Sequence, residues 1–522
     1  MTYRLTYSTM FDPPAELHQR FEAALAAVRG NLGRTWDNYV TGKPMPARDY
    51  ALALSPIDQD LVLGRFASAT TEDVGRAVAA AHEAHRGWRN TAPAHRCHIL
   101  RRVAALIEER VYDIAAAVTL EVGKNRMEAL GEVQETADFF SIYCGDFERQ
   151  QGFDHMLPDD PLPAFRSHNR SVMKPYGVWA VITPFNYPFA LAGGPVAAAL
   201  VTGNTVVLKG SEETPWAGHL LADCLHDAGV PPGVFNHLCG PGETVGAALA
   251  GHPQVGGITF TGSREVGVEL LSRCIAGAHA RPCIAEMGGK NAVIVAAGAD
   301  LDRAATGITR SAFGMGGQKC SALSRVYVDA SVADALVQKI VAQVSAISIG
   351  DPTDRKHWLG PVISAQARDN YQRYIAELQS AGARLHCGGR VLTDGALSRG
   401  FYCAPTVAEV DLAHRLWGRE MFVPIVLLAR VPDKESGMSL ANGLPFGLTA
   451  GFYGAEADIP WFLENIEAGV TYVNRPQGAT TGAWPGYQPF GGWKGSGSTG
   501  KAIASFYYLA QYLREQSQTV VE

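Results

Sequence analysis

The chain alternates short β-rich runs with stretches of helical pattern from residue 178 onward, and this alternation restricts its possible folds more than any other feature. The β-rich runs are Val178–Ile182, Thr205–Lys209, Val234–Leu238 and Gly257–Phe260. Strands that alternate with helices form βαβ units, in which crossover helices join parallel strands. The sequence therefore predicts an α/β fold with a parallel sheet.

One of the connecting helices has recognisable ends. Thr214 is a residue type that caps helix N-termini, and Pro215 suits the first helical turn. Gly229, followed by Pro231 and Pro232, is typical of a helix end. We therefore expect a helix that begins at Pro215, is capped by Thr214 and ends before Gly229.

Two further sets of elements lie in the first third of the chain and after residue 290. Apolar residues recur at three- and four-residue spacing in 71–89, 95–109 and 112–122, which predicts three helices. A second set of strands and helices begins at 291–295 and extends to 470–474, with a helix predicted at residues 364 to 380. At 522 residues the chain exceeds a single simple core, so we expect two large domains and smaller appendages.

Composition argues against several classes of function. The net charge is −6 and no basic run is longer than Arg101–Arg102, so binding to nucleic acid is not expected. The nine cysteines are scattered without a Cys-x-x-Cys pair, which favours a reducing compartment over disulfides or structural zinc. His95 and His98 flank Cys97, but no further ligand follows at zinc spacing, so no metal is expected.

Neither a signal peptide nor a membrane span is predicted. Residues 1–11 lack a basic start followed by an apolar run. The stretch 178–201 contains Asn186, the pair Gly193–Gly194 and three prolines, which would break a lipid-exposed helix. We therefore expect a cytoplasmic protein with a small-molecule partner and no membrane partner.

Three segments carry residues suited to catalysis. Cys320 stands in the glycine-rich run Gly316-Gly317-Gln318-Lys319-Cys320-Ser321-Ala322, after a long helical pattern, and this placement suits a nucleophile. Glu286 precedes the glycine pair at 288–289. Asn186 lies between two prolines at the end of an apolar strand. The chain thus offers a nucleophile, a base and an amide donor for an oxyanion.

In this order, the three segments resemble those of the aldehyde dehydrogenase superfamily. The run Gly-Gln-Lys-Cys-Ser-Ala is most similar to its glutamate-semialdehyde (1-pyrroline-5-carboxylate) dehydrogenase branch. The resemblance implies an aldehyde dehydrogenase-like α/β fold, with a Rossmann-type parallel-sheet cofactor domain, an α/β catalytic domain and a small β oligomerisation element. It also implies NAD as the cofactor and an aldehyde as the substrate.

The resemblance divides the chain into three parts. Residues 1–150 and 173–288 would form the NAD-binding domain, and residues 289–490 the catalytic domain. A hairpin at 151–172 and a tail at 491–522 would pack against a partner subunit and give a homodimer or a larger homo-oligomer. The alternative for these last two segments is a mobile flap and a helix folded on the chain's own core.

The implied reaction oxidises an aldehyde to a carboxylate through a covalent intermediate. Cys320 would attack as a thiolate, and Lys319 with nearby backbone N–H groups would lower its pKa. The Asn186 amide and the Cys320 N–H would stabilise the oxyanion. After hydride transfer to NAD, Glu286 would activate water against the thioester, since its apolar neighbours raise its pKa.

The cofactor is expected at the carboxyl ends of the parallel strands, where glycine-spaced turns follow. The resemblance assigns Lys209 and Glu212 to the adenosine ribose, Ser263 to the pyrophosphate, and Glu420 with Phe422 to the nicotinamide ribose. The Glu212 carboxylate would repel a 2′-phosphate, which favours NAD over NADP. The other implied cofactor residues are Ile182, Thr183, Pro184, Phe185, Ser211, Gly242, Gly246, Phe260, Gly262, Val266 and Gly288.

One residue in this set of motifs departs from the family pattern. Val423 stands where the family usually has glycine. A β-branched residue does not readily adopt positive φ. We therefore expect a changed loop here, with a changed hold on Glu420.

The branch resemblance also implies a site for the α-carboxylate of L-glutamate 5-semialdehyde, the substrate oxidised to L-glutamate in proline catabolism. Ser321 and the backbone N–H groups of Gly482 and Ala483 would bind it, and Tyr187 and Phe490 would enclose the aliphatic segment. The branch usually has phenylalanine where Tyr187 stands. Two alternatives stay open: a dehydrogenase of another semialdehyde or aldehyde using NAD or NADP, and a catalytically silent binding or structural member.

Overall fold

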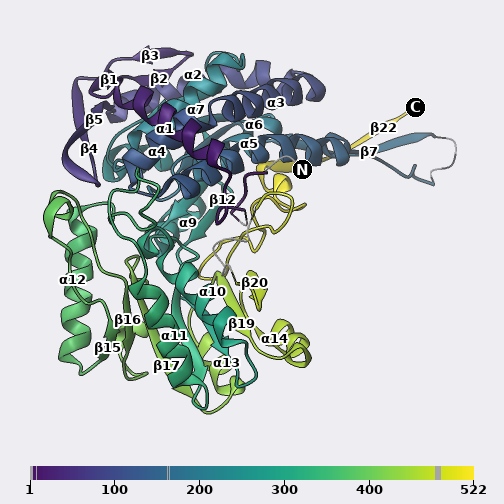
Figure 1. Ribbon diagram of the computed structural model, residues 1–522. Helices are drawn as coiled ribbons and strands as arrows, with labels where there is room; N and C mark the ends of the chain where they lie inside the picture. The colour runs from purple at the N-terminus through teal and green to yellow at the C-terminus, as the bar shows by residue number, and fades with distance from the viewer. Residues whose placement is uncertain (1–3, 8, 162, 164, 477–483) are drawn as a thin grey trace.

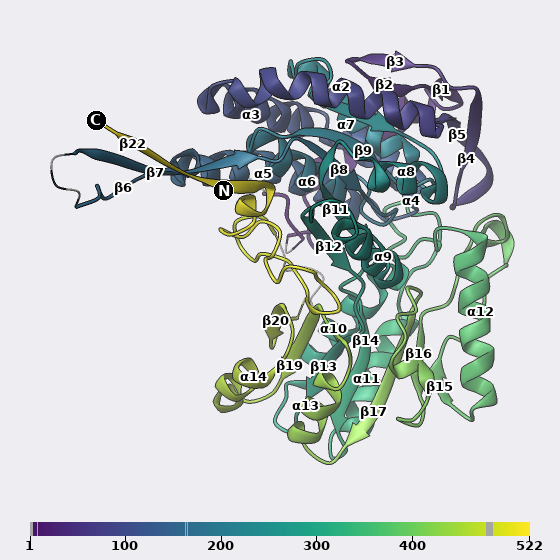
Figure 2. The ribbon, with the colours of Figure 1, turned by 180° about the vertical axis from the view of Figure 1, so that it is seen from behind.

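The computed structural model describes residues 4–7, 9–161, 163, 165–476 and 484–522. Within these residues the chain forms two lobes, each built on a seven-stranded sheet, and a narrow β ribbon that projects from the first lobe (Figure 1). Seen from behind, the segment that follows β20 runs from the second lobe back to the first (Figure 2). The two ends of the chain therefore both contribute to the first lobe.

The first lobe contains a sheet with the strand order β12-β11-β8-β9-β10-β2-β3. Strands β12 to β10 in this order are parallel, whereas β2 and β3 extend the sheet in antiparallel pairs. This topology confirms the predicted βαβ units, and it brings the carboxyl ends of the parallel strands to one edge. The strands are β2 (Asn38–Val40), β3 (Lys43–Met45), β8 (Val178–Ile182), β9 (Thr205–Lys209), β10 (Phe235–Leu238), β11 (Val255–Gly262) and β12 (Cys283–Met287).

Helices cover both faces of this sheet. Along β9, Val206 and Leu208 belong to one buried cluster and Val207 to another, because successive side chains of a strand point to opposite faces. On one face lie α2 (Thr71–Asn90), α8 (Ala247–Gly251) and α9 (Arg264–Ile275). Toward the other lie α1 (Ala15–Arg29), α3 (Pro93–Glu109), α4 (Val111–Val122), α5 (Arg126–Arg149), α6 (Ala190–Val201) and α7 (Pro215–Asp227).

The predicted helices at 71–89, 95–109 and 112–122 correspond to α2, α3 and α4, with ends shifted by at most two residues. Helix α5 was not predicted. It is buried along most of its length and mixes apolar with charged residues, so its sequence has no clear apolar stripe. The sheet edge that carries the catalytic segments packs close to this helix.

Helix α7 begins at Pro215 as expected, but its cap is not the one predicted. The Thr214 side chain makes no capping hydrogen bond. Instead the buried carboxylate of Glu121, from α4, accepts hydrogen bonds from the backbone N–H groups of Trp216 (2.5 Å) and Ala217 (3.1 Å). The first-turn donors of a helix need an acceptor, and here a residue far away in the sequence supplies it.

The second lobe contains a sheet with the order β15-β16-β17-β14-β13-β19-β20, parallel except for the edge pair β15–β16. Its strands are β13 (Asn291–Val295), β14 (Leu323–Asp329), β15 (Arg384–Cys387), β16 (Thr406–Glu409), β17 (Ile425–Val431), β19 (Thr449–Tyr453) and β20 (Val470–Val473). Its helices are α10 (Leu301–Phe313), α11 (Ala333–Ser345), α12 (Ala365–Ser380), α13 (Lys434–Asn442) and α14 (Ile459–Asn465). The helical pattern at 301–313 and the predicted helix at 364–380 are thereby confirmed, with Ser364 as the N-cap of α12.

Two smaller sheets complete the lobes. Strands β1 (Arg34–Trp36), β5 (Asp58–Ser68) and β4 (Asp49–Ser55) form one, in the order β1-β5-β4. The pair β18 (Phe446–Gly447) and β21 (Trp493–Lys494) forms the other. Strand β21 belongs to the segment that returns to the first lobe. Its pairing with β18 therefore attaches this returning segment to the second lobe.

The projecting ribbon consists of β6 (Asp154–Leu157), β7 (Ser167–Pro175) and β22 (Leu513–Val521), all antiparallel, in the order β22-β7-β6. Only β22 of the predicted tail belongs to it. The residues before β22 fold on the chain's own core, where Tyr508, Leu509 and Tyr512 are buried. The predicted boundary at 490–491 therefore does not coincide with a structural division, and the tail's end is a strand rather than a helix.

Among the described residues, no helix is both long and apolar enough to cross a membrane. All nine cysteines are free thiols.

We predict that the two parts of the tail differ in their effect on stability. A chain that ends after Ala504 loses the buried side chains of Tyr508, Leu509, Tyr512 and Leu513, each large apolar one contributing about 1.5–3 kcal/mol, whereas a chain that ends after Leu513 keeps them. Thermal unfolding followed by circular dichroism should show a clearly lower Tm for the shorter chain and a nearly unchanged Tm for the longer one. Equal Tm values for the two truncations would contradict this division of the tail.

Candidate active site

The carboxyl edge of the first sheet meets the amino edge of the second sheet, and the three predicted catalytic residues lie at this junction. Asn186 follows β8, Glu286 is in β12, and Cys320 precedes β14. Across the junction, the Asn186 Nδ2 donates a hydrogen bond to the Gln318 carbonyl oxygen at 3.0 Å. The Phe185 and Phe422 rings, one from each lobe, pack edge to face with centroids 5.8 Å apart. The fold thus brings together segments more than a hundred residues apart.

The turn that carries Cys320 is held from both sides. Before it, Met315, Gly316 and Gly317 all have positive φ, which a glycine-rich run tolerates. After it, the Asn291 side-chain amide donates to the carbonyl oxygens of Cys320 (2.7 Å) and Ala322 (2.9 Å). The nucleophile is therefore fixed by an amide from β13.

The surroundings of Cys320 differ from the prediction. Burial, together with the carboxylates of Glu420 and Glu286, raises the pKa of its thiol to about 12, although the Ser321 and Cys320 N–H groups oppose this shift. Lys319 does not serve as the expected partner, because its Nζ forms a buried ion pair with Glu128 at 2.7 Å. The thiol therefore needs a base at the moment of attack.

Glu286 has the properties predicted for a general base. Burial raises the pKa of its carboxyl to about 8, opposed by one hydrogen bond from the Gly492 N–H to Oε2 at 3.2 Å. The strand β12 is held in place by the chain returning from the second lobe, because Met287 N donates to the Ser496 carbonyl and Ser498 N to the Ala285 carbonyl. A carboxyl with this pKa exchanges a proton readily near neutral pH.

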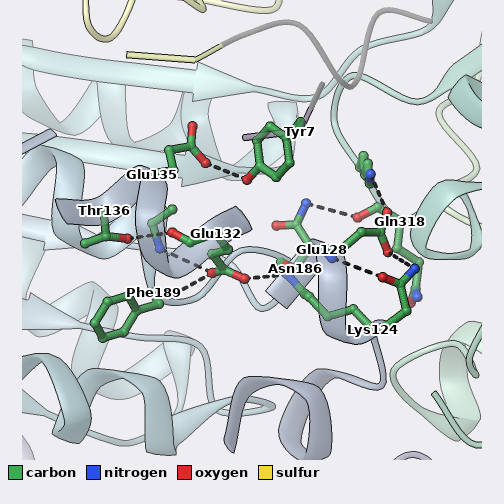
Figure 3. Close-up of polar contacts among 12 residues, drawn as sticks. Tyr7, Lys124, Glu128, Glu132, Glu135, Thr136, Asn186, Phe189 and Gln318 are labelled. Carbon is green, nitrogen blue, oxygen red and sulfur yellow. Dashed lines mark hydrogen bonds and ion pairs between the residues drawn. The ribbon is translucent and has the colours of Figure 1, made fainter. Parts of the chain in front are cut away.

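Asn186 is buried and its position is strongly constrained (Figure 3). The Gln318 carbonyl binds one hydrogen of its amide, so the second hydrogen can serve another acceptor. Its backbone oxygen accepts a hydrogen bond of 2.5 Å from Lys124 Nζ. Among the described residues its Oδ1 has no hydrogen-bond partner. The amide is thus placed as an oxyanion donor would be.

The predicted cofactor residues of the first lobe gather at the carboxyl edge of its sheet. Lys209 ends β9, and burial lowers its pKa while Glu212 raises it. The Ser263 side chain caps α9 by accepting from Val266 N at 3.3 Å. The side-chain oxygen of Thr183 is buried without a hydrogen-bond partner in the described part of the chain. The other members, at the ends of β8 and β11 or in the loops after β8, β9 and β10, are Ile182, Pro184, Phe185, Ser211, Gly242, Gly246, Phe260 and Gly262.

The Glu420 side chain lies against Gly288 at the junction between the two sheets. The Glu420 Oε1 accepts from Gly289 N at 3.0 Å, and burial raises the pKa of its carboxyl to about 7. A Cβ at Gly288 would lie 2.0 Å from this carboxylate, so only glycine leaves room for it. In the loop where Val423 departs from the family pattern, the positive φ of 57° belongs to Phe422, and Val423 does not have a positive φ.

The predicted substrate residues are only partly described. Tyr187 and Ser321 are next to the predicted oxyanion donor and nucleophile in the sequence, and Phe490 lies in an antiparallel bridge with Ile503. Burial raises the pKa of the Tyr187 hydroxyl, and Lys124 Nζ lies 3.8 Å from its ring centre. Gly482 and Ala483 lie outside the described residues.

A group with metal-ligand spacing lies in the first lobe, where Lys209 influences the pKa of two of its members. His219, His237 and Cys239 are buried on α7 and around β10, with their ligand atoms within 4.8 Å of one another. Burial lowers the pKa of His219 to about 3, and it also lowers that of His237. His237 Nδ1 has no hydrogen-bond partner among the described residues, although metal-bound histidines almost always donate from the other ring nitrogen. These side chains are best explained as neutral core residues.

Sequence reasoning missed the charged residues behind the site. Lys124, Glu128 and Glu132 are buried beside Asn186 and Lys319. The available signal was a set of charges within the apolar region 114–140, where a solvent-exposed face is not expected.

Residues 47–517 match the model of the aldehyde dehydrogenase family. The chain therefore belongs to this family, as its motifs predicted, and has its fold. A 1-pyrroline-5-carboxylate dehydrogenase of Geobacillus thermodenitrificans is 37% identical over 513 residues, covering 97% of this chain and 96% of the relative. One of Bacillus subtilis is 33% identical over 512 residues, covering 96% of each. A crystal structure of 1-pyrroline-5-carboxylate dehydrogenase from Thermus with bound NAD has a TM-score of 0.92 at 32% identity, covering 98% of this chain and 97% of that one.

The raised pKa of Glu286 predicts a pH dependence of turnover. The predicted base acts in its deprotonated form, so kcat should rise as pH increases through about 8 and fall as the carboxyl is protonated below it. In Glu286→Gln this limb should disappear and steady-state turnover should drop, while a single burst of NADH remains. Stopped-flow absorbance with an aldehyde and NAD measures both; a wild-type kcat that stays flat between about pH 6 and pH 9 would contradict the assignment.

Proposed function

We propose that this protein catalyses the NAD-dependent oxidation of L-glutamate 5-semialdehyde to L-glutamate. The observation that carries the chemistry is the meeting of Asn186, Glu286 and the Cys320 turn at one junction between the sheets. The substrate is supported by the similarity to relatives named 1-pyrroline-5-carboxylate dehydrogenase and by Ser321 directly after the nucleophile.

The residues at the junction fit NAD. The capped N-terminus of α9 offers backbone N–H groups to a pyrophosphate, since a helix N-terminus attracts anions. The Thr183 hydroxyl, which has no hydrogen-bond partner among the described residues, and the side chains of Lys209 and Glu212 offer hydrogen bonds to polar groups of the dinucleotide. Glu420, accommodated by Gly288, would bind the nicotinamide ribose. When bound, NAD supplies the acceptor for the hydride.

The first step joins Cys320 Sγ to the aldehyde carbon. Because the pKa of the thiol is high, its proton must leave to solvent water as the S–C bond forms. The carbonyl oxygen becomes an oxyanion and accepts hydrogen bonds from the Asn186 amide and the Cys320 N–H. Loss of hydride from the same carbon leaves a thioester on Cys320.

The second step hydrolyses that thioester. Glu286 removes one proton from water, the water oxygen bonds to the thioester carbon, and the C–S bond breaks; the second proton of the water passes to the Cys320 sulfur, so the products are the carboxylate and the thiol. The buried position of Glu286 matches this role, since burial gives its carboxyl a pKa of about 8. We therefore assign this carboxylate to the hydrolytic step.

The most discriminating test concerns the Ser321 hydroxyl, which we assign to the substrate α-carboxylate. Ser321→Ala should reduce kcat/KM for glutamate 5-semialdehyde by about 1–3 kcal/mol, the cost of a charged acceptor losing one partner. Propionaldehyde, which lacks the carboxylate, should be nearly unaffected, and Cys320→Ser should abolish both activities. Equal losses for the two aldehydes would instead favour a dehydrogenase of other aldehydes, with Ser321 acting only on the turn.

The second test concerns Glu212, which is exposed at the end of the β9 loop. Its carboxylate would repel the 2′-phosphate of NADP, so Glu212→Ala should narrow the preference for NAD. The ratio of kcat/KM for the two cofactors measures this preference, with Glu213→Ala as the matched neighbour. If both substitutions changed this ratio equally, residues other than Glu212 would be responsible for discriminating NAD from NADP.

We also propose that the ribbon of β6, β7 and β22 mediates self-association. It projects from the first lobe (Figure 1). The apolar side chains of Met156, Leu157, Val520 and Val521 on it are exposed. Exposed apolar side chains on an edge of a sheet favour pairing with another chain. The chain that ends after Leu513 lacks β22, so its sedimentation coefficient should be lower than that of the full chain.

A further inference from the structure

A fully buried ion pair lies behind the predicted oxyanion donor (Figure 3). Lys124, in the loop between α4 and α5, and Glu132, on α5, both have 0% exposed side chains, with Nζ and Oε2 2.5 Å apart. The catalytic steps proposed above do not use either charge. Burying such a pair costs desolvation free energy that an apolar pair of similar shape would avoid. A contribution to the free energy of unfolding therefore does not explain why this ion pair is present.

Each member of the pair binds the segment that contains Asn186. Lys124 Nζ donates a second hydrogen bond, 2.5 Å long, to the Asn186 carbonyl oxygen. The same ammonium lies 3.8 Å from the centre of the Tyr187 ring, a distance at which a cation is attracted to the ring face. Lys124 thus fixes the peptide unit that follows the Asn186 Cα.

Glu132 binds the other end of the same segment. Its Oε1 accepts from the backbone N–H groups of Phe189 (2.8 Å) and Ala190 (3.2 Å), the first turn of α6, where no side chain of α6 itself provides a cap. Helix α5 packs closely here, since Thr136 fills the space beside Gly193 of α6. The ion pair therefore clamps residues 186–190 against α5 at two points.

We propose that the Lys124–Glu132 ion pair is a positioning device that holds the Asn186 amide in place for the oxyanion; this inference rests on the function proposed above. An oxyanion donor stabilises the transition state only if it is fixed before reaction, and a shift of about 1 Å can cost a hundredfold in rate. Charge-assisted hydrogen bonds are short and directional, which apolar packing is not. The gain from this pair is therefore a fixed position of Asn186.

The test is a double-mutant cycle on the rate of the NADH burst, which reports the steps up to hydride transfer. Asn186→Ala and Lys124→Met should each slow the burst, by about a hundredfold for loss of the donor itself and by at least about tenfold for its misplacement. If Lys124 acts through Asn186, the double variant should be no slower than Asn186→Ala alone. Glu132→Gln, which keeps the shape and removes the charge, should also slow the burst and should again add nothing to Asn186→Ala.

Glu121→Gln is the matched control. Glu121 is also a buried carboxylate that binds the first-turn N–H groups of a helix, but that helix is α7, away from Asn186. The Glu121→Gln substitution should lower Tm, as Lys124→Met and Glu132→Gln do, but it should leave the rate of the NADH burst unchanged. NAD binding, measured by quenching of tryptophan fluorescence, should be unchanged in the Lys124 and Glu132 variants.

The possible failures are distinguishable. In one outcome, the two substitutions of a double variant slow the burst independently, so that their fold-changes multiply. In another, Glu121→Gln slows the burst as much as the clamp variants do. Either outcome would show that the pair acts on stability alone, and it would overturn this inference while leaving the proposed function intact. A normal burst in Asn186→Ala would overturn the oxyanion assignment, and this inference with it. Because Glu132→Gln is isosteric, it provides the cycle if Lys124→Met does not fold.

Discussion

The site depends on one constraint, namely that parallel strands end at a common edge. The parallel strands of the first lobe place their carboxyl ends side by side, those of the second lobe place their amino ends side by side, and the loops at these two edges meet across the junction. The hydrogen bond from Asn186 to the Gln318 carbonyl and the contact of Phe185 with Phe422 are direct results. The chain returning from the second lobe then holds β12, and with it Glu286, at the same junction.

Burial at this junction determines the chemistry of the ionisable groups. Removing carboxyls from water raises the pKa of Glu286 to about 8 and of Glu420 to about 7, and it also keeps the Cys320 thiol protonated. Burial at the junction therefore disfavours the charged forms of both carboxyls and of the thiol. In the fully buried Lys124–Glu132 pair, strong hydrogen bonds to backbone groups accompany each charge.

Several errors of sequence reasoning share a cause: the sequence neighbour was taken for the spatial partner. Lys319 adjoins Cys320 but pairs with Glu128, and Thr214 precedes α7 but does not cap it. The tail was treated as one unit although Tyr512 and β22 have different environments. In each case the contacts of the residue depend on a partner more than ninety residues away or on the burial of its side chain. The local spacing of residues in the sequence shows neither.

The sequence by itself determined the α/β class, the alternation of elements, the family and the identity of the three catalytic candidates, because strand and helix periodicity and short motifs are local properties. Tertiary structure alone decided which charges surround those residues. The buried helix α5, whose sequence shows no clear apolar stripe, contributes Glu132, and the loop before it contributes Lys124. Burial and long-range contact set the pKa of a group and fix a donor in place, and both exist only once the chain has folded.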